Sequence, residues 1–199
     1  MRIPLLLTFC VFLSPTSSLA ADLPLEAGVC AGCHGEQGQG INNLGPRLAG
    51  LPAQYLERQV NLFKGGSRQN VTMHAMAMGI GGEQLQKVAN YFSAQPVQPV
   101  APVRRGEQTA YTDPAAKLVY QGDWSRTLPA CATCHGPATI GVGQIPRLAG
   151  QQADYLKNQL VAWQQGKRAG DPDNTMGNIA GKLSGAEIDA LSSYLANLQ

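Results

Sequence analysis

Charge is scarce in this sequence of 199 residues, and its two signs nearly balance. Lys and Arg together number 15, Asp and Glu together number 13, and the formal net charge is +2. Nucleic-acid-binding domains carry clustered basic residues in clear excess. We therefore expect no nucleic-acid partner. The weak net charge also indicates little long-range electrostatic steering toward any other partner.

Aromatic residues and runs of β-branched residues are also few. Phe, Trp and Tyr make up 6 % of the chain, whereas it has 23 glycines and 13 prolines. Such a composition favours short helices joined by loops over a sheet. No segment shows the alternation typical of a strand, so the sequence predicts an all-α fold. With so few aromatic side chains, something else is expected to fill its cores.

A long hydrophobic run is absent as well. The apolar stretch from Ile3 to Leu13 has about 11 residues, and a spanning helix needs about 20. This stretch follows Arg2 and precedes small residues at Ser18 and Ala20, a pattern typical of a cleavable export signal. We predict cleavage after Ala20, which would leave the mature chain with four of its five cysteines.

Those four cysteines and two of the three histidines form two copies of one motif, C-x-x-C-H. The copies are Cys30, Cys33 and His34, and Cys131, Cys134 and His135. Exported cysteines usually form disulfides, but two C-x-x-C-H motifs at equivalent positions of a repeat are not expected by chance. A thiol redox motif normally follows a strand. A zinc site needs four ligands close together, and the two motifs are far apart in the chain.

The motif is typical of covalent attachment of a c-type haem. Two thiols add to the two vinyl groups of the porphyrin as thioethers, and the next residue directs its imidazole at the iron. We therefore predict two covalent haem c groups, each with an iron. The predicted haem-binding residues are Cys30, Cys33, Cys131 and Cys134, and the first axial ligands of the iron are His34 and His135.

The second half of the chain repeats the first. The stretch "GPRLAGLPAQYLERQVNLFKGGSR" begins at Gly45 and "IPRLAGQQADYLKNQLVAWQQGKR" begins at Ile145. Between the copies, "AQPVQPVAPVRRG" is a proline-rich spacer. The predicted division is a signal peptide at 1–20, a first domain at 21–95, a linker at 96–106 and a second domain at 107–199. The hydrophobic core of a first domain this short gives only marginal stability, so each copy should need a cofactor.

Apolar spacing predicts a helix after Pro52, ended by the glycines at 65 and 66, and its repeat after Gln151. Closing helices are expected from Gly82 to Ala94 and from Ser184 to Leu198. The second of these begins with a capping box, in which Ser184 precedes Glu187 by three residues.

The second axial ligand is predicted from the repeat. Beyond its haem histidine, the second half has one methionine, Met176, and the alignment places Met73 opposite it. Met76 and Met78 have no counterparts and stay as alternatives to Met73. Methionines are also common core fillers. Ligation by His and Met raises the reduction potential and closes both axial positions, which favours electron transfer over catalysis.

Each half resembles a class I cytochrome c domain in its CxxCHG motif, the "PRLAG" loop, the "YL-x-x-Q" helix and a methionine before a closing helix. The tandem arrangement resembles cytochrome c4, the dihaem electron carrier of the bacterial periplasm. The resemblance implies two class I cytochrome c domains, each wrapped around one haem, and a periplasmic location. It also implies that the carbonyls of Pro46 and Pro146 accept a hydrogen bond from the haem histidines.

Arg47 and Arg147 are within reach of haem propionates in such a domain, but ordinary surface charge is the favoured interpretation of both. Class I domains have a helix before the motif. Only "ADLPLEAGV" precedes Cys30 after cleavage, so the first opening helix should be short. "LVYQGDWSRTLPAC" predicts a fuller one in the second half.

Three functions are compatible with these residues. The first is a periplasmic carrier of single electrons from a quinol-oxidising complex to a terminal oxidase. The second is the haem-carrying electron-acceptor subunit of a periplasmic dehydrogenase such as a flavocytochrome. The third, a dihaem peroxidase, would need an open axial position, so we expect no enzyme. Peripheral association with a membrane stays open.

Overall fold

A computed structural model describes residues 22–101 and 111–198. The predicted signal peptide and part of the predicted linker lie outside these ranges. Within them, all regular elements are helices, and strand-like pairing occurs only in isolated bridges. The prediction of an all-α chain is therefore confirmed. None of the helices in the described part is long and apolar enough to cross a membrane.

The helices of the two halves follow the same order along the chain. The first half contains η1 (Leu25–Ala27), α1 (Gly28–His34), α2 (Ala53–Lys64), α3 (Val71–Met78) and α4 (Gly82–Ser93). The second half contains α5 (Pro114–Tyr120), η2 (Trp124–Arg126), α6 (Cys131–His135), η3 (Pro137–Thr139), α7 (Ala153–Gln164), η4 (Pro172–Asn174), α8 (Thr175–Ala180) and α9 (Gly185–Ala196).

The predicted helix boundaries are confirmed where strong signals marked them. α2 begins after Pro52 and ends before Gly65, and it buries Leu56 and Phe63 on one face. α9 begins after Ser184, whose side chain accepts a bond from the Glu187 amide while the Glu187 carboxylate accepts the Ser184 amide. These reciprocal bonds satisfy two amides that a helix start leaves unpaired.

The opening helices differ from each other. In the first half, only the three-residue η1 precedes the motif helix α1, so the opening helix is short, as predicted. The second half has the fuller opening helix that was predicted, α5, but the stretch "LVYQGDWSRTLPAC" gave the wrong bounds, because α5 begins at Pro114 and ends at Tyr120. Asp113 caps its start and Pro114 occupies its first turn. Gly122, with φ +73°, turns the chain out of the helix, and only a short 3-10 turn follows.

Each half has its own hydrophobic core, built by its closing helix. In the first half, Ala27 of η1 packs with Val88, Ala89 and Phe92 of α4. In the second, Val119 of α5 packs with Ile188, Leu191 and Leu195 of α9. The short N-terminal segment of the first half is therefore held against α4 by Ala27, the last residue of η1.

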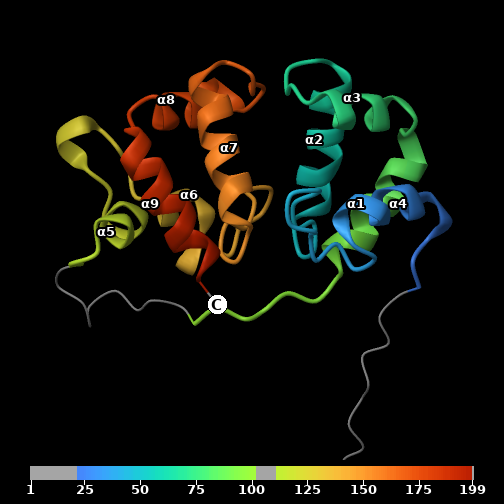
Figure 1. Cartoon of the computed structure of the whole chain (residues 1–199), viewed down its shortest axis with the longest axis horizontal. Coiled ribbons are helices and arrows are strands. Elements are labelled where there is room, and N and C mark those ends of the chain that lie inside the picture. Colours follow the sequence, from blue (N-terminus) through green and yellow to red (C-terminus); the bar gives the residue numbers. More distant parts are fainter. Residues whose placement is uncertain (1–21, 102–110, 199) are drawn as a thin grey trace, which may run out of the picture.

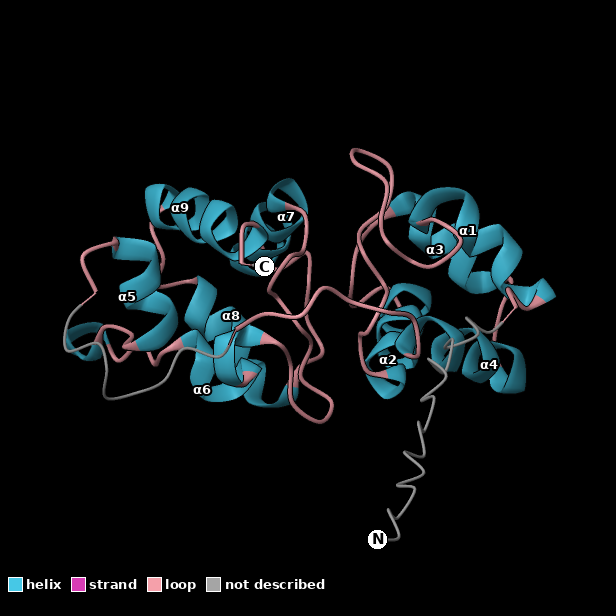
Figure 2. Ribbon diagram, turned by 90° about the horizontal axis from the view of Figure 1, so that it is seen from below, coloured by secondary structure: helices cyan, strands magenta, loops and turns pink. Residues whose placement is uncertain are grey.

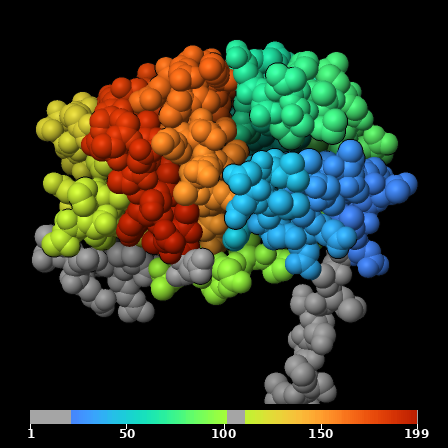
Figure 3. Space-filling view, in the orientation of Figure 1, coloured from blue at the N-terminus to red at the C-terminus, as the bar shows by residue number. Residues whose placement is uncertain are grey.

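The two groups of helices stand side by side, with α2 and α7 facing each other across the middle (Figure 1). The segment after α4 crosses between the groups on one side (Figure 2), and the two halves touch along their boundary (Figure 3). Paired backbone bonds join them: the Gln69 amide donates to the Lys167 carbonyl at 2.8 Å, and the Ala169 amide donates to the Ser67 carbonyl at 2.7 Å.

Candidate functional site

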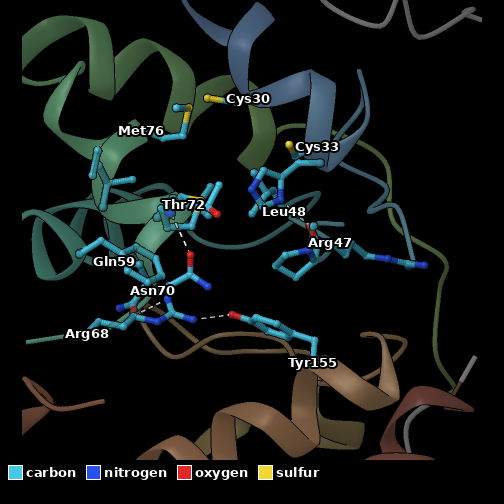
Figure 4. Close-up of a pocket in the computed structure, with 18 of the residues that line it drawn as sticks. Cys30, Cys33, Arg47, Leu48, Gln59, Arg68, Asn70, Thr72, Met76 and Tyr155 are labelled. Carbon is cyan, nitrogen blue, oxygen red and sulfur yellow. Dashed lines mark hydrogen bonds between the residues drawn. The ribbon is translucent and has the colours of Figure 1, made fainter. Parts of the chain in front are cut away.

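The first C-x-x-C-H motif forms α1. Residues three and four apart share one helix face, so Cys30, Cys33 and His34 come together and all line one cavity of about 1450 Å³. Figure 4 shows both thiols at the same end of this cavity. The four cysteines of the described ranges form no disulfide. No cluster of described His, Cys, Asp and Glu side chains could hold a metal by itself.

His34 is oriented for ligation of an iron. Its side chain is buried, 6 % exposed, and its Nδ1 lies 2.8 Å from the Pro46 carbonyl oxygen. Because a carbonyl only accepts, Nδ1 carries the proton and the lone pair is left on Nε2. Burial lowers the pKa of His34, and the bond to Pro46 opposes that shift only in part. The imidazole is therefore neutral, the form that binds metals.

Gly45 lets the loop carrying Pro46 approach the motif. A Cβ on Gly45 would lie 2.5 Å from the Cys33 carbonyl oxygen and 3.0 Å from His34 Nδ1. Real Cβ atoms essentially never lie this close to such an oxygen. The absent side chain is what allows the His34–Pro46 bond to form.

Sulfur donors reach the same cavity from α3. Met73 and Met76, one turn apart, are among its lining residues. Asn70 caps this helix by accepting a bond from the Met73 amide at 2.8 Å, and Met73 is half-buried. Met78, at the helix end, is 61 % exposed. Met73 is thus well placed, and its assignment as the axial ligand stays a prediction.

The second motif forms α6 and repeats this arrangement. His135 is buried, and its Nδ1 donates to the Pro146 carbonyl at 2.8 Å. Burial lowers the pKa of His135 against the opposing bond to Pro146, and the charge of Arg168 lowers it further. The bonds to both prolines were predicted and are confirmed. Met176, half-buried at the start of α8, donates its amide to Asp171 at 2.6 Å, and its role stays a prediction.

A polar cluster, hereafter the interface cluster, lies between the two halves. It consists of Tyr55, Gln59, Arg68, Tyr155, Gln159 and Arg168. Arg68 donates to Tyr155 Oη at 2.6 Å and to Gln159 Oε1 at 2.7 Å. Arg168 donates in return to Tyr55 Oη at 3.0 Å. The sequence showed these residues only as matched positions of the repeat and did not indicate that they meet.

Arg147 is not the surface charge that was expected, and Arg47 makes contacts through its backbone. Arg147 is buried and donates to the carbonyls of Ala149 and Gln98, at 2.8 and 2.7 Å. It therefore fixes the segment after α4. The backbone of Arg47 pairs with the Gln151 side chain, as both donor and acceptor, at 2.9 Å. Its guanidinium points away from the cavity in Figure 4.

A family model for cytochrome c matches the chain twice, over residues 25–95 and 119–199. The chain belongs to the cytochrome c family. Each match contains one C-x-x-C-H motif with its buried histidine, so this cytochrome has two tandem domains and binds two haem c groups covalently. The cavity fits such a group: two thiols and an imidazole lie on one wall, thioether side chains reach it from α3, and its lining is mainly apolar.

Two kinds of protein stand out among the relatives that match. This cytochrome is 42 % identical over 174 residues to a thiosulfate dehydrogenase electron acceptor from Stutzerimonas stutzeri, covering 86 % of this chain and 80 % of that protein. It resembles the structure of reduced recombinant cytochrome c4 from Pseudomonas stutzeri with a TM-score of 0.76 and 32 % identity, covering 87 % and 95 % of the two chains.

A longer protein also contains this architecture. The structure of a thiosulfate dehydrogenase (TsdBA) from Marichromatium purpuratum matches with a TM-score of 0.74 and 39 % identity. The match covers 85 % of this chain but only 36 % of that one. The relatives therefore support a dihaem, cytochrome c4-like electron carrier.

Proposed function

We propose that this cytochrome accepts single electrons from a periplasmic dehydrogenase of the thiosulfate dehydrogenase type and passes them to a terminal oxidase. The observation that carries this is the 42 % identity, over most of both chains, to a thiosulfate dehydrogenase electron acceptor. The same architecture occurs within a thiosulfate dehydrogenase chain. Of the functions compatible with the sequence, this is the second, the haem-carrying electron acceptor of a periplasmic dehydrogenase. The dehydrogenase is here a thiosulfate-oxidising enzyme in place of a flavoprotein.

The axial ligands proposed for this role are His34 with Met73 and His135 with Met176. These side chains would hold a haem that supplies reversible one-electron redox chemistry and would leave no iron position open to oxygen or peroxide. The protein's own part is to fix the two imidazoles through Pro46 and Pro146 and to keep water from the apolar cavity. This favours a carrier over an enzyme.

The test is reduction of the haems by the enzyme. The purified dihaem protein would be mixed with a thiosulfate dehydrogenase and thiosulfate in a stopped-flow instrument, with haem absorbance as the readout. We expect reduction at least tenfold faster than for a monohaem cytochrome c of similar potential. Equal rates for both proteins would contradict the proposal.

A second candidate is the carrier between a quinol-oxidising complex and a terminal oxidase, supported by the match along 95 % of a cytochrome c4 chain. The same instrument separates the two candidates. Fast reduction by the quinol-oxidising complex, with slow reduction by the dehydrogenase, would favour this second role.

Export to the periplasm is part of the proposal. The support is the apolar stretch Ile3–Leu13 with small residues before the predicted cut after Ala20. N-terminal sequencing of protein released from the periplasm should give Ala21 as the first residue. A chain found only in the cytoplasm with Met1 retained would contradict it.

A further inference from the structure

His74 is the one histidine of the sequence that lies outside the two C-x-x-C-H motifs. It directly follows Met73 on α3. Successive residues of a helix point about 100° apart, so the two side chains leave α3 on different sides. Met73 lines the cavity of the first haem and His74 does not. The imidazole therefore acts from outside the cavity, on the helix that carries the proposed axial ligand.

The imidazole of His74 bonds to the end of α2. Its Nδ1 lies 2.8 Å from the carbonyl oxygen of Phe63, in the last turn of that helix. A carbonyl only accepts, so Nδ1 carries the proton and donates it, which the neutral and the charged imidazole can both do. Carbonyls at the end of a helix lack their usual partner within it. The bond thus joins the first turn of α3 to the last turn of α2.

A second side chain ties the far end of α3 to the same turn of α2. Lys64, the residue after Phe63, donates from Nζ to the carbonyl of Ile80, just beyond α3, at 2.6 Å. Phe63 is only 7 % exposed, so this turn belongs to the packed part of the domain. Figure 1 shows α3 beside α2. Both ends of α3 are therefore fixed to α2, and Met73 is next to the attachment made by His74.

The second domain has only one of these two ties. Gln164 of α7 holds the end of α8, because its Nε2 donates to the carbonyls of Ala180 and Leu183, both at 2.8 Å. The repeat places Gly177 opposite His74, and a glycine has no side chain with which to reach α7. The tie at the start of the methionine-bearing helix is thus particular to the first domain.

The start of α8 is held by its own segment instead. The Met176 amide donates to Asp171, and Thr175 Oγ1 donates to the Pro172 carbonyl at 2.8 Å. Among the described residues, no side-chain hydrogen bond joins the first turn of α8 to α7. The two methionines are therefore held by different means, and only Met73 has a neighbour that is bonded to the preceding long helix.

We propose that His74 is a positioning residue for the axial sulfur of the first haem. Groups behind a metal ligand orient it and strengthen its hold on the metal. Withdrawal of the Met73 sulfur is easier when the first turn of α3 can shift away from α2, and the bond from His74 to Phe63 opposes that shift. The inference deepens the proposed function and rests on it for Met73 as the ligand.

The test is competition between the axial methionine and added imidazole for the ferric iron, at one fixed pH. The readout is the red absorption band of methionine-bound ferric haem in the dihaem protein. In His74→Leu, imidazole should replace the methionine of the first haem at a concentration about two- to tenfold lower, which is the net effect of one hydrogen bond. The second haem should require the same concentration as in the parent protein. Met73→Ala, which removes the band of the first haem only, assigns the two steps.

Two further variants separate positioning from a general loss of stability. His74→Asn keeps an N–H donor close to the place of Nδ1 and should restore the concentration of the parent protein. Tyr91→Phe is the matched control, because Tyr91 Oη donates to the Glu36 carbonyl at 2.9 Å within the same domain. Tyr91 lies on α4 and does not line the cavity. This variant loses a comparable bond away from α3, so imidazole binding should not change.

Four results would overturn the inference. The first is an unchanged imidazole concentration in His74→Leu. The second is an equal change in Tyr91→Phe, which would mean general destabilisation of the domain. The third is a change in His74→Asn as large as that in His74→Leu, which would mean that the hydrogen bond is not what matters. The fourth, retention of the whole band in Met73→Ala, would overturn the proposed ligation together with the inference, whereas the first three leave that ligation standing.

Discussion

At the scale of single residues, the haem motifs act through atoms outside them. The thiols and the imidazole share a face because α1 is helical, but the tautomer of His34 is set by the carbonyl of Pro46, twelve residues later. Proline suits this position because it lacks only the donor and keeps its acceptor. The same bond at Pro146 shows that the duplication preserved the orientation of the ligand along with the motif.

Met73→Ala should remove the axial sulfur of the first haem. We expect loss of the red absorption band of methionine-bound ferric haem for one haem of two, a lower potential for that haem and binding of carbon monoxide. Met76→Ala is the control, because Met76 lines the same cavity one turn away. Loss of the band in Met76→Ala, with retention in Met73→Ala, would reverse the assignment.

Gly45→Ala should destabilise the first domain by about 1–3 kcal/mol, because the added methyl group has no space beside the Cys33 carbonyl. The measurement is equilibrium unfolding in denaturant, followed by haem absorbance. Gly28→Ala is the control within the same motif helix, since nothing lies within 4 Å of a Cβ there. Equal stability of the Gly45→Ala variant and the parent would refute the steric argument.

The sequence predicted the haem-binding residues because their chemistry imposes a fixed local spacing. It predicted the proline carbonyls through a family resemblance, since a contact across twelve residues leaves no local pattern. Surface charge was the favoured interpretation of Arg47 and Arg147, and it is wrong for Arg147, which is buried, whereas Arg47 points away from the cavity (Figure 4). Both follow the bonding prolines in sequence, but side-chain direction depends on the loop conformation, which the sequence did not specify.

At the scale of elements, helices with strong start and stop signals were predicted well. The α9 capping box, the Pro52 start of α2 and the glycines after α2 all fix backbone conformation locally. The opening helix of the second domain was misplaced because "LVYQGDWSRTLPAC" has helical apolar spacing. Gly122 and the turn at Asp123 interrupt the helix within this stretch. The residues that start α5, Asp113 and Pro114, precede the stretch in the sequence.

Glu187 should make the stability of the second domain depend on acid pH. Its bonds to Arg126 and to Ser184 lower its pKa from 4.5 to about 2. Because the folded pKa is the lower one, the stabilisation is complete above about pH 4.5 and is lost as the pH falls toward 2. Glu187→Gln should therefore destabilise at pH 7 by about 1 kcal/mol.

Urea unfolding of the Glu187→Gln variant and the parent at several pH values measures this. The difference in unfolding free energy should shrink between pH 4.5 and 2. Asp189→Asn is the matched control, because its carboxylate pairs with Lys157 on a largely exposed surface. A difference for Glu187→Gln that persists unchanged at pH 2 would contradict the assignment.

At the scale of the whole molecule, the main finding is the way that the two domains meet. Gln151, which is buried, satisfies both backbone groups of Arg47 in the other domain. The interface cluster joins the same domains at α2 and α7. One sequence shows that two copies share residues at equivalent positions, but it carries no signal that those positions face each other. The domain interface therefore could not be predicted.

Gln151→Ala should loosen the docking, because the partly buried amide and carbonyl of Arg47 lose their partner, at about 0.5–1.5 kcal/mol for each bond. We expect faster hydrogen exchange at the Arg47 amide. Gln164→Ala is the control, since Gln164 bonds only within the second domain, to Ala180 and Leu183. Equal exchange rates at Arg47 in both variants would mean that Gln151 does not hold the interface.

Covalent attachment of one haem to each domain is the central claim, and intact mass spectrometry tests it most directly. Protein from a host able to mature c-type cytochromes is treated with a thiol-alkylating reagent under denaturing conditions and weighed. The account predicts the mass of the mature chain plus two haems, with Cys30, Cys33, Cys131 and Cys134 all unmodified by the reagent. A mass without haem, with four alkylated thiols or with two disulfides, would contradict it.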